Sequence, residues 1–166
     1  LRPIAECDNR ISMESIFERV ENFLRQQGID FQVLRHEPVY TSEQAAAVRG
    51  VPLASGAKAL VCKVDERFAL FVIPADRKLD GKRVRQALGS RSLRFATVDE
   101  LRQLTGLAPG SVPPFGHLFG LATCCDSRMA DSEKINFNAG DHSISVSMHW
   151  VDYLRVENPT LGSFTA

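Results

Sequence analysis

The sequence has few cysteines, no long apolar run and no excess charge of either sign. Its four cysteines, Cys7, Cys62, Cys124 and Cys125, form no CxxC pair. No apolar segment with a cleavage site opens the chain, so we expect a reducing, cytoplasmic setting. The longest apolar stretch, residues 68–73, is far shorter than the ~20 residues that a membrane helix needs. These absences argue against a disulfide scaffold and a membrane protein.

The charges balance, with 20 basic and 20 acidic residues, so the chain has no overall field that would attract nucleic acid. Any such partner must bind a local patch. One segment is rich in basic residues, which are Arg77, Lys78, Lys82, Arg83, Arg85, Arg91 and Arg94. It is interpreted equally well as a solvated helix face or as a surface that binds RNA phosphates through Arg77, Lys78, Lys82 and Arg83.

Several common functional motifs are also missing. There is no glycine-rich GxGxxG or GxxxxGK[ST] phosphate loop and no GxSxG nucleophile turn. The spacing of His117, His142 and His149 relative to the cysteines matches no usual zinc site. The spacing argues against metal binding, and a zinc site, a Cys-His hydrolase and a Ser-His-Asp triad stay as alternatives without a sequence signature.

The 166 residues, 44% of them hydrophobic, predict one globular domain. Apolar residues at three- and four-residue spacing predict a helix over residues 12–28, with Ser12 as its N-cap and residues 1–11 as an extension. A strand at residues 31–34 and a small-residue helix that begins after Thr41 or Ser42 and stops near Gly50 follow.

The rest of the chain alternates between strands and helices. Two apolar runs, residues 58–64 and 68–73, predict a buried antiparallel hairpin. Further predicted elements are helices at 81–88 and 98–104, the second with a capping box of Thr97 and Glu100, strands at 135–137 and 144–148, and a helix at 149–156. This order favours a mixed α/β sheet or a partly closed barrel over a doubly wound parallel sheet.

Two segments carry residues suited to ester chemistry. Lys58 stands at the start of an apolar strand behind small residues, where its ammonium must reach solvent, an acid or a ligand. Taken alone, this position is explained more simply by a lysine that extends to the surface. The proline-containing loop 110–116 offers the amides of Ser111 and Val112 as oxyanion donors, or is only a rigid turn. His36, Tyr40 and Thr41 lie at a strand-to-helix junction where ligands often bind, although His36 could be structural.

Together, these segments resemble one family, the YbaK and prolyl-tRNA-synthetase-associated editing domains. The resemblance covers about residues 29–156. The segments that carry it are HEPVYTSEQAA at 36–46, GAKALV at 56–61, GSVPPFG at 110–116 and NAG at 138–140. Ala59 departs from members with Thr or Asn after the lysine, so known substrate preferences are not transferred.

The resemblance implies a YbaK-like mixed α/β fold, a largely antiparallel sheet that forms a partly closed barrel with surrounding helices, and hydrolysis of mischarged tRNA without metal or cofactor. Lys58 matches the family's required lysine. We expect it to bind the 3′ acceptor end while the loop shapes the amino-acid pocket. The predicted substrate-binding residues are His36, Tyr40, Thr41, Gly110, Ser111, Val112, Pro114, Phe115, Gly116, Asn138, Gly140 and His142.

The expected function is therefore that of a free-standing trans-editing deacylase, because no synthetase catalytic or anticodon-binding region is present. Its substrate would be a small or hydroxyl-bearing amino acid on tRNA(Pro) or a related tRNA, and its partners that tRNA and a synthetase. The chain would act as a monomer or homodimer, away from membranes. A non-catalytic module that binds tRNA or a synthetase, and a hydrolase of another small ester or amide, are the alternatives.

Overall fold

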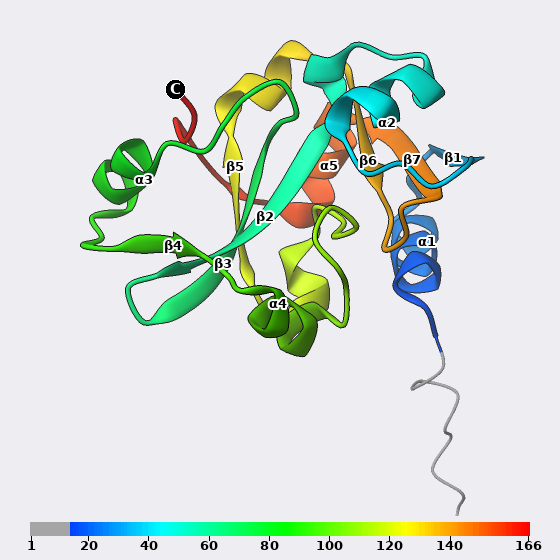
Figure 1. Cartoon of the computed structure of the whole chain (residues 1–166). Coiled ribbons are helices and arrows are strands. Elements are labelled where there is room, and N and C mark those ends of the chain that lie inside the picture. The colour runs from blue at the N-terminus through cyan, green and yellow to red at the C-terminus, as the bar shows by residue number, and fades with distance from the viewer. Residues whose placement is uncertain (1–13) are drawn as a thin grey trace, which may run out of the picture.

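The computed structural model describes residues 14–166, which form two β-sheets with helices packed around them (Figure 1). The expected extension, together with Ser12, lies outside the described residues. Helix α1 spans Ile16–Gln26, and the Ser15 hydroxyl accepts a hydrogen bond of 3.1 Å from the Glu18 amide. The prediction of Ser12 as the N-cap is therefore wrong. The predicted apolar pattern began at Met13 and so favoured Ser12, whereas the observed helix begins at Ile16 and Ser15 caps it.

The smaller sheet has three antiparallel strands in the order β1 (Phe31–Arg35), β7 (Ile144–His149) and β6 (Lys134–Asn138). All three were predicted from sequence. The polar face of β7 is less exposed than its alternating pattern predicted, because Ser145 is only 3% exposed. Helix α2 (Ser42–Arg49) is capped by Thr41, one of the two predicted caps, and supplies the arginine that bonds to this serine.

The larger sheet has five strands in the order β4 (Leu93–Phe95), β2 (Ala57–Val64), β3 (Arg67–Pro74), β5 (Ala122–Asp126) and β8 (Thr160–Gly162). The predicted antiparallel hairpin of β2 and β3 is confirmed, with Lys58 opposite Ile73. Strands β4, β5 and β8 were not predicted. The ladders of β5 with β3 and with β8 are parallel, whereas β4 pairs with β2 in antiparallel fashion.

The two sheets meet at one bridge, between Gly56 and Asn136. The mixed α/β class is therefore confirmed. Among residues 14–166 the ladders do not close into a ring, and the partly closed barrel stays a prediction. None of the helices in this part of the chain combines the length and apolar character that crossing a bilayer requires.

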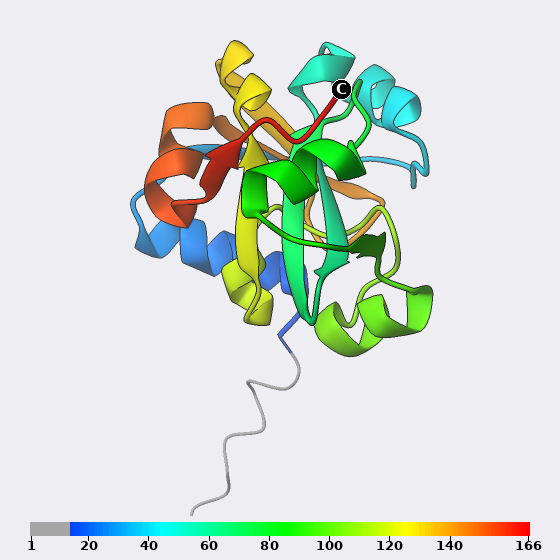
Figure 2. The same cartoon turned by 90° about the vertical axis from the view of Figure 1, so that its left-hand side faces the viewer.

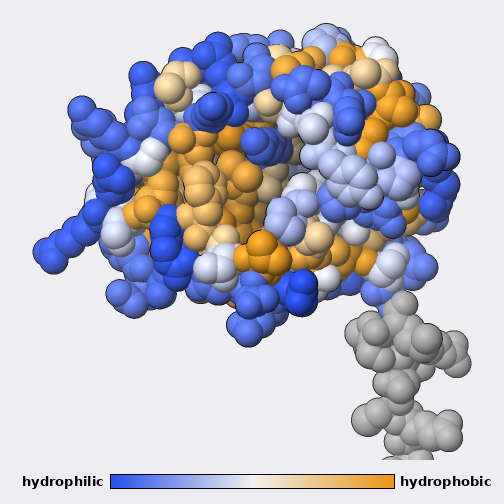
Figure 3. Space-filling view, in the orientation of Figure 1, coloured by the Kyte–Doolittle hydropathy of each residue, from blue (hydrophilic) through white to orange (hydrophobic). Residues whose placement is uncertain are grey.

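The main core lies between the facing sides of the two sheets, where Val61 and Val72 share a cluster with Phe137 and Val146. Helices α1, α4 (Val98–Thr105) and α5 (Trp150–Glu157) contribute to it. The predicted capping box of α4 is present. A smaller core forms on the other face of the larger sheet, which helix α3 (Gly81–Leu88) covers (Figure 2). In Figure 3, apolar side chains gather in a hollow over this sheet, bordered by hydrophilic residues.

Candidate functional site

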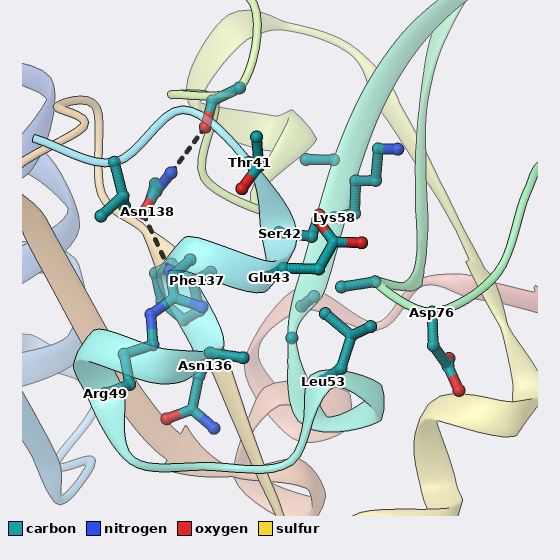
Figure 4. Close-up of a pocket in the computed structure, with 18 of the residues that line it drawn as sticks. Thr41, Ser42, Glu43, Arg49, Leu53, Lys58, Asp76, Asn136, Phe137 and Asn138 are labelled. Carbon is teal, nitrogen blue, oxygen red and sulfur yellow. Dashed lines mark hydrogen bonds between the residues drawn. The ribbon is translucent and has the colours of Figure 1, made fainter.

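A cavity of about 560 Å³ opens where the two sheets meet. Its walls come from the start of β2, from β6, from helix α2 and from the loops before α3 and around Gly110 (Figure 4). Of the predicted site residues, those that line this cavity are Lys58, Tyr40, Thr41, Gly110, Val112, Asn138, His142, Arg77 and Lys78. The structure thus brings together segments that are far apart in the sequence.

The cavity lies beside a stretch of the β2 edge that pairs with no strand among residues 14–166. Within the described residues, strand β4 pairs only with residues 62–64 of β2, and β6 bridges only to Gly56, the residue before β2. On the β4 side, the Val61 carbonyl accepts a hydrogen bond of 2.9 Å from the Ala96 amide. Because backbone groups point to the same edge at every second residue, the N–H and C=O of Ala59 point toward the open edge. A peptide donor is therefore available next to Lys58.

Lys58 extends from β2 with an exposed side chain that lines the cavity (Figure 4). It takes part in none of the ion pairs found among residues 14–166. Lys63, farther along the same strand, contacts the Glu66 carboxylate at 3.9 Å. The ammonium of Lys58 is thus free to bind a negatively charged or electron-rich group.

Arg49, which was not predicted, forms part of the opposite wall. Its Nη2 donates to Asn138 Oδ1 at 2.8 Å, and Asn138 Nδ2 donates to the Gly110 carbonyl at 2.7 Å (Figure 4). Both partners of the guanidinium in the structure, Asn138 and Ser145, are neutral. Burial lowers the pKa of Arg49 to about 10, because water no longer solvates the charge fully. Asn138 therefore connects a partly buried cation to the loop at Gly110.

His36 does not line the cavity, but it belongs to the same hydrogen-bond network as Arg49. Its Nδ1 lies 2.8 Å from the Glu37 carbonyl and its Nε2 lies 2.7 Å from Ser145 Oγ. A carbonyl can only accept, so Nδ1 carries a proton, and in the neutral ring Nε2 accepts from the Ser145 hydroxyl. Ser145 Oγ in turn accepts from Arg49 Nε at 2.8 Å. His36 is placed to hold Ser145 and Arg49 in position.

The proline-containing loop is a shaped loop, as predicted, but most of it faces inward. The Ser111 amide donates to the Ala108 carbonyl at 3.2 Å, and Ser111 and Val112 are both buried. The prediction that the Ser111 amide is an exposed donor is therefore wrong, whereas that for the Val112 amide stays a prediction. The dihedral angles that turn an amide inward cannot be recognised from composition alone. Gly110 and Val112 do line the cavity, whereas Ser111 does not.

Four other predicted residues also lie outside the cavity, and each has a packing role. Phe115 is fully buried in an aromatic cluster, and the Pro114 carbonyl accepts from the Tyr153 hydroxyl at 2.7 Å. A Cβ on Gly116 would lie 2.7 Å from the Leu121 carbonyl oxygen. Gly140 has a φ of +84° and packs against α1, where no side chain fits.

The predicted basic patch is split in two. Arg77 and Lys78 are exposed and line the cavity. Lys82 and Arg83 lie on α3, in a separate depression that they share with Asp80. Arg83 contacts the Asp80 carboxylate at 3.7 Å, so part of its charge is offset. Whether these residues contact RNA stays a prediction.

The alternatives based on cysteine and histidine find no support in the geometry. Within residues 14–166, no three side chains of His, Cys, Asp or Glu gather as a metal site. His117 contacts the Glu157 carboxylate at 2.5 Å, away from the cavity. Burial raises the pKa of the Cys124 and Cys125 thiols, which keeps them protonated and poorly nucleophilic.

Within residues 14–166, the domain is of the mixed α/β class, and one cavity brings together the ammonium of Lys58, which has no ion-pair partner there, the strand-edge amide of Ala59 and the exposed basic residues Arg77 and Lys78. The family model of the aminoacyl-tRNA editing domain matches residues 36–156. The chain belongs to this family.

Similar proteins agree with this assignment. The chain is 35% identical over 152 residues to the multifunctional Ser/Thr-tRNA deacylase ProXp-y of Escherichia coli strain K12, a match that covers 89% of this chain and 91% of that protein. It is 25% identical over 144 residues to the prolyl-tRNA editing protein ProX of Acetoanaerobium sticklandii, with 83% and 88% covered. The solved structure of a proposed trans-editing enzyme for prolyl tRNA synthetase has a TM-score of 0.82 at 24% identity, across 91% of this chain and 97% of that chain, and shows a shared fold.

Proposed function

We propose that this protein is an aminoacyl-tRNA deacylase that acts in trans and hydrolyses the ester of a mischarged tRNA. The observation that carries the proposal is the position of Lys58, which lines one cavity with Gly110, Asn138 and His142 and has no ion-pair partner in the part of the chain that the structure describes. Family membership and the likeness to a Ser/Thr-tRNA deacylase over most of both chains support the same conclusion.

The chemistry needs little from the protein. An aminoacyl ester is already activated, so positioning and stabilisation of the oxyanion suffice. Water attacks the carbonyl carbon, the bond to the ribose oxygen breaks, and that oxygen leaves with a proton as a hydroxyl. In this mechanism Lys58 binds the ester region or the terminal nucleotide electrostatically. The Ala59 amide, in place of the predicted Ser111 amide, donates to the developing oxyanion.

The cavity wall favours a small or hydroxyl-bearing amino acid. Asn138, Arg49 and Thr41 present polar groups to it, and a polar pocket that hydrogen-bonds a substrate hydroxyl discriminates strongly against analogues without one. The tRNA is proposed to be tRNA(Pro) or a related tRNA, with Arg77 and Lys78 contacting its acceptor-end phosphates and a synthetase as a further partner. Whether the protein acts as a monomer or a homodimer stays a prediction.

The test is a deacylation panel with Lys58→Ala and a matched control, Lys63→Ala on the same strand. tRNAs carrying serine, threonine, alanine or cysteine are incubated with each protein, and loss of the ester is followed. We expect Lys58→Ala to slow hydrolysis by about 100-fold or more, as removal of an electrostatic contact to the reacting group does elsewhere. Lys63→Ala should stay within about twofold, since surface changes have small effects.

Circular dichroism confirms that both variants are folded. A folded Lys58→Ala protein with the full rate would contradict the role of the lysine. A wild-type protein that binds these tRNAs but hydrolyses none of them would favour the non-catalytic module.

A further inference from the structure

Tyr40 is an aromatic side chain that packing does not explain. At 74% it is the most exposed of the large hydrophobic side chains in residues 14–166, although tyrosine normally buries most of its ring. It directly precedes Thr41, the N-cap of α2, a position from which an apolar side chain often packs against the first turn of the helix. Here the ring remains in solvent at the mouth of the cavity.

The ring is nevertheless held in place. The Tyr40 amide donates to Gln44 Oε1 at 3.1 Å, which fixes the backbone at the start of α2. The ring lies against the His142 imidazole, with 4.9 Å between centroids and 40° between planes. His142 is held in turn, because its Nε2 lies 3.0 Å from the Pro109 carbonyl. The two rings therefore form an aromatic pair that is held in place on the cavity rim. Most of the surface of the Tyr40 ring is exposed to solvent.

We propose that the Tyr40–His142 pair is a stacking platform for the 3′-terminal nucleobase of the RNA substrate. This inference rests on the proposed function and adds to it a binding site for the base. The aminoacyl group and its ribose enter the cavity near Lys58, so the base attached to that ribose lies at the rim. A flat base covers an exposed ring well, whereas a small polar amino-acid side chain would leave most of the ring in water. Aromatic side chains bind single-stranded bases in this way regardless of base identity.

The platform is tested with a fluorescent RNA. The probe is a short RNA hairpin that ends in CCA, in which 2-aminopurine replaces the terminal adenine and serine is attached through a non-hydrolysable amide. Stacking quenches 2-aminopurine, so binding to the wild type should quench the signal. Tyr40→Ala should abolish the quenching and raise Kd by about 5- to 100-fold, the range for loss of one base–aromatic stack. Tyr40→Phe, which retains the ring, should restore both.

The matched control is Phe95→Ala, which removes another exposed aromatic ring, 59% exposed and outside the cavity. It should change neither quenching nor Kd. A second RNA lacks the terminal base, and with it the fluorophore, but retains its ribose and the seryl amide, so its Kd is measured by competition with the fluorescent probe. The wild type should bind this RNA as weakly as Tyr40→Ala binds the complete probe. Tyr40→Ala should bind the base-less RNA with the same Kd as the complete probe.

Two results would overturn the platform: Tyr40→Ala quenches the probe like the wild type, or it weakens binding of the complete and the base-less RNA by the same factor. If the wild type still deacylates seryl-tRNA in that case, the proposed function stands without the platform. Failure of the wild type to bind either RNA or to hydrolyse any aminoacyl-tRNA would overturn the proposed function, and the platform with it.

Discussion

Asn138 connects two parts of the cavity wall, and its replacement by alanine tests whether that connection shapes the site. The substitution removes the hydrogen bond from Arg49 and the one to the Gly110 carbonyl. A bond to a charged group contributes ~1.5–3 kcal/mol and a neutral one ~0.5–1.5 kcal/mol. Because Asn138 is half-buried, water compensates for part of the stability that the two lost hydrogen bonds contribute. We therefore expect the free energy of unfolding to fall by ~1–3 kcal/mol.

The assay has a thermodynamic and a kinetic readout. Urea denaturation gives the loss of stability, which for a chain of this size corresponds to a fall in Tm of about 2–10 °C. Under the proposed function, kcat/KM for seryl-tRNA should also fall by about 10- to 100-fold, because a small displacement of the Gly110 loop misplaces the ester. Asn22→Ala is the matched control. It removes a hydrogen bond of 2.6 Å to Glu14 on the surface and should cost less than about 0.5 kcal/mol.

The role of Arg49 is separated by a double-mutant cycle. Arg49→Met combined with Asn138→Ala should lose less stability than the sum of the single changes, with a coupling of ~0.5–3 kcal/mol, since the two side chains share one bond. Additive effects, or an Asn138→Ala protein that retains both its stability and its rate, would refute the idea that this side chain holds the loop.

Two further predictions concern buried groups away from the cavity. Asp126 is 1% exposed and accepts hydrogen bonds from the backbone amides of Phe164 and Thr165. Asp126→Ala should therefore lower the free energy of unfolding by ~3–5 kcal/mol, as measured by urea titration. A loss below about 1 kcal/mol would contradict this. Burial raises the pKa of Cys62 to about 12, whereas the unfolded thiol ionises near 9.0, so stability should fall as pH rises from about 9 toward 12. At pH 8 the native Cys62 thiol should therefore label far more slowly than the denatured one, as mass spectrometry of the peptide can measure.

The elements with strong local patterns could be predicted from sequence. The hairpin of β2 and β3 has two apolar runs around a polar turn, and the α4 capping box is visible in Thr97 and Glu100. Strands β4 and β8 are only three residues long, and β5 pairs in parallel with a strand more than forty residues away. Their identity depends on distant partners, which no local pattern encodes.

The candidate site was predicted unevenly for a related reason. Lys58 stood out because a charge interrupts an apolar segment, whereas Arg49 lies at the end of a short polar helix, where an arginine normally indicates a solvated face. The sequence gives no local indication that Arg49 is partly buried. Its partner, Ser145, lies on a distant strand, and the hydrogen bond between them forms only in the folded protein. The 110–116 segment was recognisable as a loop, but the direction of each amide depends on dihedral angles that the residue types do not determine.

The shortness of strand β4 has a consequence for substrate size. The chain leaves β4 after Phe95 because Thr97 begins helix α4, so the strand ends before it reaches the edge of β2 at Ala59. Two residues inserted before Thr97 would let the ladder continue along β2 toward Ala59, and one of their two side chains would point to each face of the sheet. The position of this helix cap thus leaves the Ala59 edge uncovered, and a two-residue insertion before Thr97 tests whether a covered edge restricts the acyl groups that the proposed deacylase accepts.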